Sequence, residues 1–339
     1  MKNKLLTARD IKAYYRLVDG QEVKAVDGVS LDLYEDEVVG IAGESGCGKS
    51  SFASVLGLTY NPPLYVNSGE MLVQGKDIFK MNKEELRRDI RGQYISVVPQ
   101  GAMNALNPTQ KIGSFVIDVI REHYPERTPE EALNLARERM EALGLPARVL
   151  DSYPHQLSGG MKQRTIIVIS TLLNPKVLIA DEPTSALDVS SQKVVIRLML
   201  ELLRKKIIRN IVFITHELPL LRHFADRVAI MYAGQMAELG PMEDVIFDPM
   251  HPYTQALMGS MLTAEPGTKS REITGIPGVP PDLKNPPKGC RFADRCPYAT
   301  EKCRTEQPQP RRVGDRTVWC HCTEHINLPQ TATENRKSS

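Results

Sequence analysis

The sequence lacks what would place it inside a membrane, outside the cell or on a nucleic acid. No segment offers the roughly 18 uninterrupted apolar residues of a membrane-spanning helix, and the best run, 165–173, lies between Arg164 and Lys176. The first fifteen residues hold no apolar core of signal-peptide length. A net charge of +2 is too small for a nucleic-acid-binding face. We therefore expect a cytosolic protein that reaches a membrane only through a partner.

Cysteine is scarce except in one segment near the C-terminus. Cys47 stands alone, whereas the other five lie within 33 residues: Cys290, Cys296, Cys303, Cys320 and Cys322. Without an export signal, a metal or cluster site explains this crowding better than disulfides. Six prolines between 275 and 297 also deny the segment a helix or a central strand. We expect cross-links through the cysteines to order it.

What the chain does contain is a complete phosphate-binding loop. Residues 43–50 read Gly-Glu-Ser-Gly-Cys-Gly-Lys-Ser, which is G-x-x-x-x-G-K-S, and follow the apolar run Glu37–Ala42. The glycines let backbone N–H groups approach phosphates ahead of a helix expected from about Gly48. Lys49 is a cation for the β- and γ-phosphates, and Ser50 can ligate Mg²⁺. The predicted nucleotide-binding residues are Gly43, Glu44, Ser45, Gly46, Cys47, Gly48, Lys49, Ser50 and Ser51.

A second apolar run, 177–180, ends in two carboxylates. Asp181 suits the magnesium shell, and Glu182 suits the general base for an attacking water. Many strands end in acidic loops, so this pair alone is a weak signal. Together with the phosphate loop it predicts hydrolysis of a nucleoside triphosphate.

The hydrophobic patterns predict an α/β protein. The runs 37–42, 177–180 and 211–215 lack alternation, which is typical of parallel strands buried on both faces. The first forty residues and 69–78 mix polar and apolar positions, which predicts an antiparallel sheet beside the nucleotide. Between about 100 and 175 the pattern is helical. There Thr128 and Glu131 predict a capping box for a helix that Gly144 ends.

Several motifs in order along the chain resemble the nucleotide-binding domain of ABC transporters. They are residues 43–50, Gln100, the Leu-Ser-Gly-Gly string at 157–160, residues 177–182, the Ser-Ala-Leu-Asp string at 185–188, and His216. The resemblance covers roughly residues 5–260. It implies an ABC cassette of the P-loop NTPase class in residues 1–260, with a mostly parallel core sheet, an antiparallel β subdomain and a helical subdomain at about 100–175.

The same resemblance implies roles for single residues. Gln100 would lie near both the magnesium and the permease contact, His216 at the γ-phosphate, and Asp188 in the D-loop. Tyr15 would stack on adenine, with Tyr14 as the neighbouring alternative. The expected catalytic residues are thus Glu182, His216 and Gln100, and the expected magnesium ligands are Ser50, Gln100 and Asp181.

The resemblance also implies that the ATP site is shared between two subunits. In this family the signature residues, here Ser158, Gly159 and Gly160, close over the ATP held by another subunit. Met161 stands where many members have Gln, and Cys47 where Ser is common. Neither change removes a charge or a backbone donor, so we expect an active enzyme.

The C-terminal part resembles the extension of oligopeptide/dipeptide-type ABC ATPases. The resemblance is carried by His-Pro-Tyr-Thr at 251–254, Gly-Cys-Arg-Phe at 289–292 and Arg-Cys-Pro-Tyr at 295–298. It implies that Cys290, Cys296, Cys303 and Cys320 hold a [4Fe-4S] cluster. Spacing alone does not distinguish this from a four-cysteine zinc site, and Cys322 or His321 could replace Cys320. We expect the extension to span 261–322 and a disordered tail to follow at 323–339.

The leading hypothesis is an ATPase that powers import of di- or oligopeptides from the cytoplasmic face of the membrane. Its expected partners are two permease subunits, a second ABC ATPase, expected to be a paralogue, and, indirectly, a substrate-binding protein; no nucleic-acid partner is expected. Within the same machine the cargo could be an oligosaccharide or a nickel complex. A soluble ABC ATPase acting on nucleic acid or ribosomes is the alternative of another class, but such proteins usually carry two cassettes or coiled-coil inserts. An inactive interaction subunit is disfavoured because Lys49, Glu182 and His216 are all present.

Overall fold

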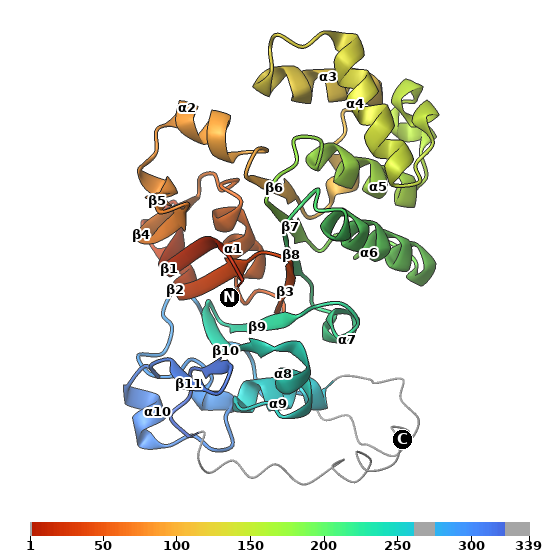
Figure 1. Ribbon diagram of the computed structural model, residues 1–339. Coiled ribbons are helices and arrows are strands. Elements are labelled where there is room, and N and C mark those ends of the chain that lie inside the picture. Colours follow the sequence, from red (N-terminus) through yellow and green to blue (C-terminus); the bar gives the residue numbers. More distant parts are fainter. Residues whose placement is uncertain (1, 261–274, 323–339) are drawn as a thin grey trace, which may run out of the picture.

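The computed structural model describes residues 2–260 and 275–322, and its centre is a mixed eight-stranded sheet (Figure 1). The strand order is β11-β12-β10-β9-β3-β8-β7-β6, and neighbours from β9 to β6 run parallel. The strands are β3 (Glu37–Ala42), β6 (Ile95–Val98), β7 (Val177–Asp181), β8 (Asn210–Ile214), β9 (Arg227–Tyr232), β10 (Gln235–Pro241), β11 (Arg311–Val313) and β12 (Arg316–Val318). Every residue of β3, β7 and β8 is buried, which confirms the predicted parallel strands.

A second, antiparallel sheet lies beside the first and is formed mainly by the N-terminal part. Its order is β2-β1-β4-β5, from β1 (Lys4–Arg16), β2 (Glu22–Tyr34), β4 (Leu64–Val73) and β5 (Lys76–Asp77). Helix α1 (Lys49–Leu56) contacts strands of both sheets, and its Phe52 is fully buried. The helix that begins at the phosphate loop is therefore held from two sides.

Helices α3 (Ile112–His123), α4 (Pro129–Ala142) and α5 (Gly159–Ser170) gather at one end of the molecule (Figure 1). The predicted capping box is present, since Thr128 accepts from the N–H of Glu131 and Glu131 accepts from that of Thr128. Ala136 and Met140 are fully buried, and Gly144, at φ 68°, follows the end of the helix.

The remaining helices are distributed over the molecule. They are α2 (Lys83–Glu85), α6 (Val189–Arg204), α7 (Leu218–Leu221), α8 (Met242–Phe247), α9 (Pro252–Gly259) and α10 (Glu301–Thr305). Helix α2 lies near β4 and β5, and α10 lies in the C-terminal segment (Figure 1). Short 3₁₀ turns cover Ile78–Lys80, Ala102–Asn104, Ala147–Asp151, Pro154–Gln156 and Ala293–Arg295, and Leu86–Ile90 is a π-helical turn. With the two sheets, these helices agree with the predicted mostly parallel core sheet, antiparallel β subdomain and helical subdomain.

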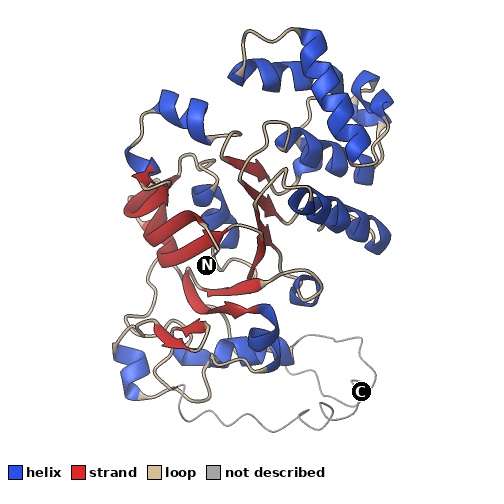
Figure 2. Cartoon of the chain, in the orientation of Figure 1, coloured by secondary structure: helices blue, strands red, loops and turns tan. Residues whose placement is uncertain are grey.

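Residues 275–322, blue in Figure 1, lie at the opposite end of the molecule from α3 and α4, where helices, short strands and loops are mixed (Figure 2). Strand β12 pairs with β10 through Val318 and Glu238, so this segment adds strands to the edge of the central sheet. Phe292 is 2% exposed and meets the rings of Tyr232 and Tyr253 at 5.2 and 5.4 Å. The segment thus shares the core of the main domain. Cysteine cross-links are therefore not its only source of order, which corrects the expectation from its proline content.

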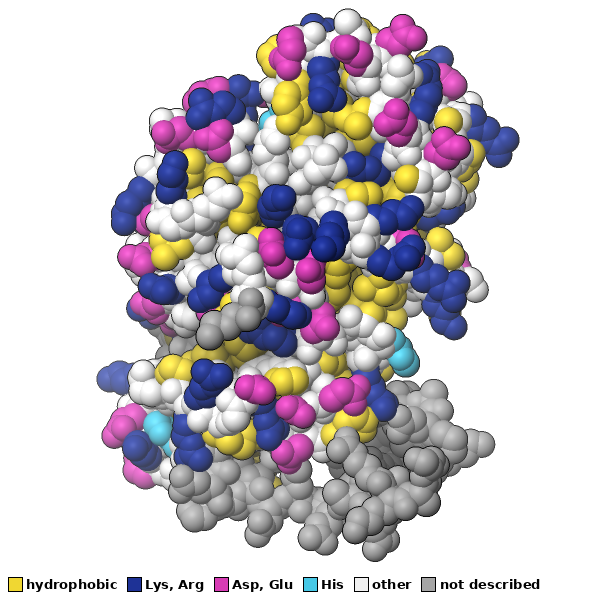
Figure 3. All heavy atoms as spheres, in the orientation of Figure 1, with side chains coloured by type: hydrophobic (Ala, Val, Ile, Leu, Met, Phe, Trp, Pro, Cys, Tyr) yellow, Lys and Arg dark blue, Asp and Glu magenta, His cyan; other side chains and the backbone are white. Residues whose placement is uncertain are grey.

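The surface carries charges of both signs. Figure 3 shows Lys and Arg side chains interspersed with Asp and Glu over the described part of the visible face. Among residues 2–260 and 275–322, no helix has the length and apolar character required to cross a bilayer. The predicted tail, 323–339, and the start of the predicted extension, 261–274, lie outside the described residues.

Candidate ATP site

The loop between β3 and α1 has the backbone geometry that phosphate binding requires. Gly43 has φ 150°, and a Cβ there would lie 2.1 Å from the carbonyl oxygen of Met231. Gly48 has φ 101°, and its Cβ would lie 2.0 Å from the carbonyl oxygen of Ala25. Glycine is therefore sterically required at both positions. The tight turn aims the N-terminus of α1 at whatever the loop holds.

The side chain of Lys49 is hydrogen-bonded to the backbone of this loop. Its ammonium group donates to the carbonyl oxygens of Gly43 (2.8 Å) and Glu44 (2.9 Å), and the residue is only 6% exposed. Backbone carbonyls only partly compensate the burial of an ammonium group, and the Asp181 carboxylate is close enough for its charge to interact with that of Lys49. An anionic phosphate chain entering the loop would add further negative charge beside the ammonium.

Two of the three predicted magnesium ligands, Ser50 and Asp181, lie in contact. The hydroxyl of Ser50, at the start of α1, donates to Asp181 Oδ1 at 3.2 Å, although 131 positions separate them. Asp181 ends β7 and is 5% exposed. Burial raises its pKa, and the hydrogen bond from Ser50 opposes that rise. A divalent cation beside these two oxygens would relieve the burial of the carboxylate.

Glu182 and His216 also lie together. His216 Nδ1 is 3.0 Å from Glu182 Oε1, and the residues follow the neighbouring strands β7 and β8. Glu182 has φ 47°, a left-handed conformation that costs a non-glycine residue roughly 1–2 kcal/mol. Its N–H donates to Ile214 O (2.9 Å), which holds this conformation. Such strain is typical of functional positions.

Gln100 and Tyr15 approach the site from two further strands. Val98 of β6 pairs with Ala180 of β7, so Gln100 emerges at the same sheet edge as Asp181 and is exposed. The Tyr15 hydroxyl lies 3.0 Å from Ser51 Oγ on α1. Tyr14 is buried, and its hydroxyl donates to Asp27 at 2.6 Å. Tyr15 is thus the better placed of the two for adenine stacking, and that role stays a prediction.

The signature residues lie at an exposed helix end. Ser158 caps α5 by accepting from the N–H of Met161 at 3.3 Å, and it is exposed. Asp188 caps α6 by accepting from the N–H groups of Ser190 and Ser191, both at 3.0 Å. The hydroxyl of Ser191 is the largest cause that lowers the pKa of Asp188, so this carboxylate is ionised. Both helix ends are free to face a second subunit.

Residues that the sequence analysis missed hold the phosphate loop from behind. The Glu44 N–H donates to the hydroxyl of Tyr253 at 2.8 Å. The Glu44 carboxylate accepts from Arg295 at 2.7 and 3.0 Å. Nearby, Arg291 donates to the Ala233 carbonyl and to Asp27. In the sequence, each of these two arginines stands next to a cysteine. Nothing in their spacing indicates which residues they bind in the folded chain.

The C-terminal cysteines are neighbours of one another. In each pair among Cys290, Cys296, Cys303 and Cys320, ionisation of one thiol would raise the pKa of the other. Burial first, then the other thiolates, raises the pKa of Cys290 and Cys296 to about 11. Cys322 Sγ lies 3.9 Å from Cys303 Sγ. In the described parts of the chain, no group of three or more His, Cys, Asp or Glu side chains is positioned to hold a metal ion.

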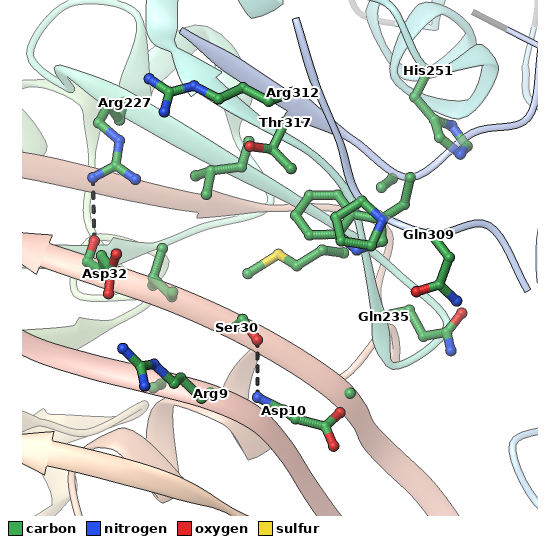
Figure 4. Close-up of a pocket in the computed structure, with 18 of the residues that line it drawn as sticks. Arg9, Asp10, Ser30, Asp32, Arg227, Gln235, His251, Gln309, Arg312 and Thr317 are labelled. Atoms are coloured by element: carbon green, nitrogen blue, oxygen red, sulfur yellow. Dashed lines mark hydrogen bonds between the residues drawn. The ribbon is translucent and has the colours of Figure 1, made fainter.

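A groove of about 1500 Å³ opens elsewhere, between β1, β2 and the β10–β12 edge (Figure 4). Its charged side chains are largely engaged with one another: Arg227 donates to Asp32 O and to Glu37, and Lys4 pairs with Asp32. Its lining contains none of the predicted ATP-site residues. The groove is therefore separate from the nucleotide site.

Comparison with known proteins finds the same two parts. Residues 26–185 match the family described as ABC transporter, and residues 237–303 match the oligopeptide/dipeptide transporter C-terminal region. The dipeptide transport ATP-binding protein DppD of Caldanaerobacter subterraneus subsp. tengcongensis is 41% identical, with 94% of this chain and 97% of the relative covered. The oligopeptide transport ATP-binding protein OppD of Bacillus subtilis is 42% identical, with 92% and 87% covered.

A solved structure is similar over the cassette. It is a dimeric post-hydrolysis state of the ATP-binding cassette MJ0796 bound to ADP and Pi, with a TM-score of 0.61 and 26% identity. The similarity covers 70% of this chain and 99% of that one.

Proposed function

This chain belongs to the ABC transporter family, among its oligopeptide/dipeptide-type ATP-binding subunits, and we propose that it hydrolyses ATP to power import of di- and oligopeptides. The observation that carries the proposal is the convergence of Ser50 with Asp181 and of Glu182 with His216 at one sheet edge. The phosphate loop enters that same edge from β3.

The residues divide the work as follows. Lys49 and the loop N–H groups bind the β- and γ-phosphates, and Ser50 and Asp181 ligate Mg²⁺, with Gln100 completing the shell. Glu182 accepts the proton of the attacking water. His216 orients Glu182 and donates to the γ-phosphate. The signature residues of a second ABC ATPase close the site, so turnover needs two subunits.

We propose that the ATPase works at the cytoplasmic face of the membrane. There it would bind two permease subunits, with a substrate-binding protein delivering the peptide to them. The relatives are named as dipeptide and oligopeptide transport ATP-binding proteins, which supports peptide as the cargo over an oligosaccharide or a nickel complex. Nothing in the ATP site itself contacts cargo, so this part of the proposal depends on the relatives.

We also propose that Cys290, Cys296, Cys303 and Cys320 hold a [4Fe-4S] cluster, with zinc as the alternative. Their mutual proximity supports this set, because ionisation of any one of the four thiols would raise the pKa of another in the set. A four-iron cluster is larger than a single ion, so its ligands lie farther apart than those of zinc. When bound, the cluster would supply a structural cross-link between the loops of residues 290–320.

The cargo is tested by disrupting the gene in its host. The disrupted strain should lose growth on di- and oligopeptides as the amino-acid source, and it should resist toxic peptide analogues. The wild-type chain should restore both phenotypes, whereas Lys49→Ala should restore neither. Loss of oligosaccharide or nickel uptake with peptide uptake intact would contradict the peptide assignment while leaving the ATPase assignment in place.

A further inference from the structure

Arg295 uses every N–H of its guanidinium to bind the phosphate loop and its surroundings. Nη1 donates to Glu44 Oε2 (2.7 Å) and to the Tyr232 hydroxyl (3.1 Å), and Nη2 donates to Glu44 Oε1 (3.0 Å) and Ile276 O (3.2 Å). Nε donates to Pro277 O at 2.7 Å. The arginine is only 8% exposed. A fork paired this completely is among the stronger ion pairs that proteins form.

Glu44 is the second residue of the phosphate loop, so its charge belongs to the loop that is to bind a triphosphate. Its carbonyl oxygen accepts from Lys49, the cation predicted to meet the β- and γ-phosphates. Its negative charge is felt at Cys47 inside the loop, where it adds to the effect of burial in raising the pKa of the thiol. An unpaired carboxylate at this position would repel the phosphates that the loop must attract.

We propose that Arg295 neutralises Glu44 and thereby sets the affinity of the loop for ATP. The inference rests on the proposed function, namely that this loop binds ATP. Arg295 does not touch the nucleotide in this scheme; it is a positioning residue that acts through Glu44. The C-terminal segment thus supplies, from 251 positions away, a charge that the cassette lacks.

The alternative is that Arg295 only docks the C-terminal segment, and charge separates the two ideas. If neutralisation matters, the effect must grow with the number of phosphates. Removing both charges must also undo the effect of removing one. If Arg295 only docks the segment, its loss should lower the affinity for ATP, ADP and adenosine equally. A second substitution at Glu44 should then restore none of these affinities.

The experiment measures the affinity of the full-length chain for ATP, ADP and adenosine by calorimetry. Arg295→Gln should weaken ATP binding on the order of tenfold, ADP binding less, and adenosine binding not at all. Adding Glu44→Gln to that variant should recover most of the loss for ATP. The matched control is Arg304→Gln, which removes an exposed arginine of the same segment paired with Asp294 at 3.0 Å; it should leave all three affinities unchanged.

Unchanged ATP affinity in Arg295→Gln, or equal losses for all three ligands, would overturn the inference. If Arg295→Gln does not fold, the single variant Glu44→Gln tests the inference. It leaves the charge of Arg295 unpaired beside the loop. ATP affinity should then rise relative to ADP, and a fall would count against the proposal. A wild-type chain that binds no ATP would overturn both the proposed function and this inference. If the wild type binds ATP, the variants test the inference alone.

Discussion

His216 Nδ1 lies 3.0 Å from Glu182 Oε1, and the two residues follow adjacent parallel strands at the edge where the phosphate loop begins. The contact orients the Glu182 carboxylate, whose backbone is held in a left-handed conformation. A general base needs this kind of fixed direction toward its water. The pair is therefore the part of the site with the clearest consequence for turnover.

Glu182→Gln should lower the rate of ATP hydrolysis by roughly 10²–10⁴-fold, the contribution typical of a general base. The amide keeps the size of the side chain and its hydrogen bond to His216 but cannot accept the proton. ATP binding should persist, and an ATP-bound dimer should accumulate on gel filtration. Turnover like that of the wild type would show that Glu182 is not the base.

Ser158→Arg should abolish turnover while leaving the nucleotide affinity of the isolated subunit nearly unchanged. Ser158 lies at the exposed end of α5, where it faces a partner's ATP in the proposed assembly. Lys49→Ala should instead weaken binding itself, because it removes the cation inside the loop. The measurement is a nucleotide titration of both variants under conditions that keep the chain monomeric. Equal loss of affinity in both would contradict a site shared between subunits.

Anaerobically purified protein should be brown, with broad absorbance near roughly 400 nm and about four irons per chain. Cys296→Ser should bleach it and make residues 275–322 easier to proteolyse. Cys320→Ser and Cys322→Ser identify the fourth ligand, since only substitution of the true ligand should lower the iron content. Colourless protein with about one zinc would shift the assignment to zinc. Metal-free protein with an equally resistant extension would rule out both.

Protein stability should fall as the pH decreases from about 6.5 to about 4 because of His251. Burial lowers the pKa of His251 from 6.5 to about 4 in the folded chain. Between these values the unfolded chain binds more protons than the folded one, so acid favours unfolding, by about 3 kcal/mol at most. Above pH 6.5 this contribution is fully present.

The check is the pH dependence of urea unfolding in the wild type and in His251→Asn. Asparagine can still accept from the N–H of Tyr253, as His251 Nδ1 does at 3.0 Å, but it does not titrate. The slope of stability against pH in this window should therefore flatten in the variant. An unchanged slope would mean that other groups cause the acid sensitivity.

Local sequence was sufficient for the elements around the nucleotide. The unbroken apolar run before Gly43 predicts a strand buried on both faces, and β3 is such a strand. The capping box at Thr128 and Glu131 predicts the start of α4 to the residue, since its hydrogen bonds join atoms three positions apart. The order of the motifs likewise anticipates the meeting of Ser50 with Asp181, because parallel strands bring their carboxyl ends to one edge.

The attachment of the C-terminal segment depended on tertiary structure alone. Prolines and cysteines predict a segment without regular structure, held by cross-links, but they do not indicate that β12 joins the central sheet or that Phe292 enters its core. The pairing of Arg295 with Glu44 depends on side chains 251 positions apart that share no periodicity or motif. By itself the sequence determined the chemistry of the loop, because the glycines, Lys49 and Ser50 lie within one short motif whose spacing places their functional groups. Only the folded chain decided which distant charge completes it, because burial and pairing are properties of the packed core.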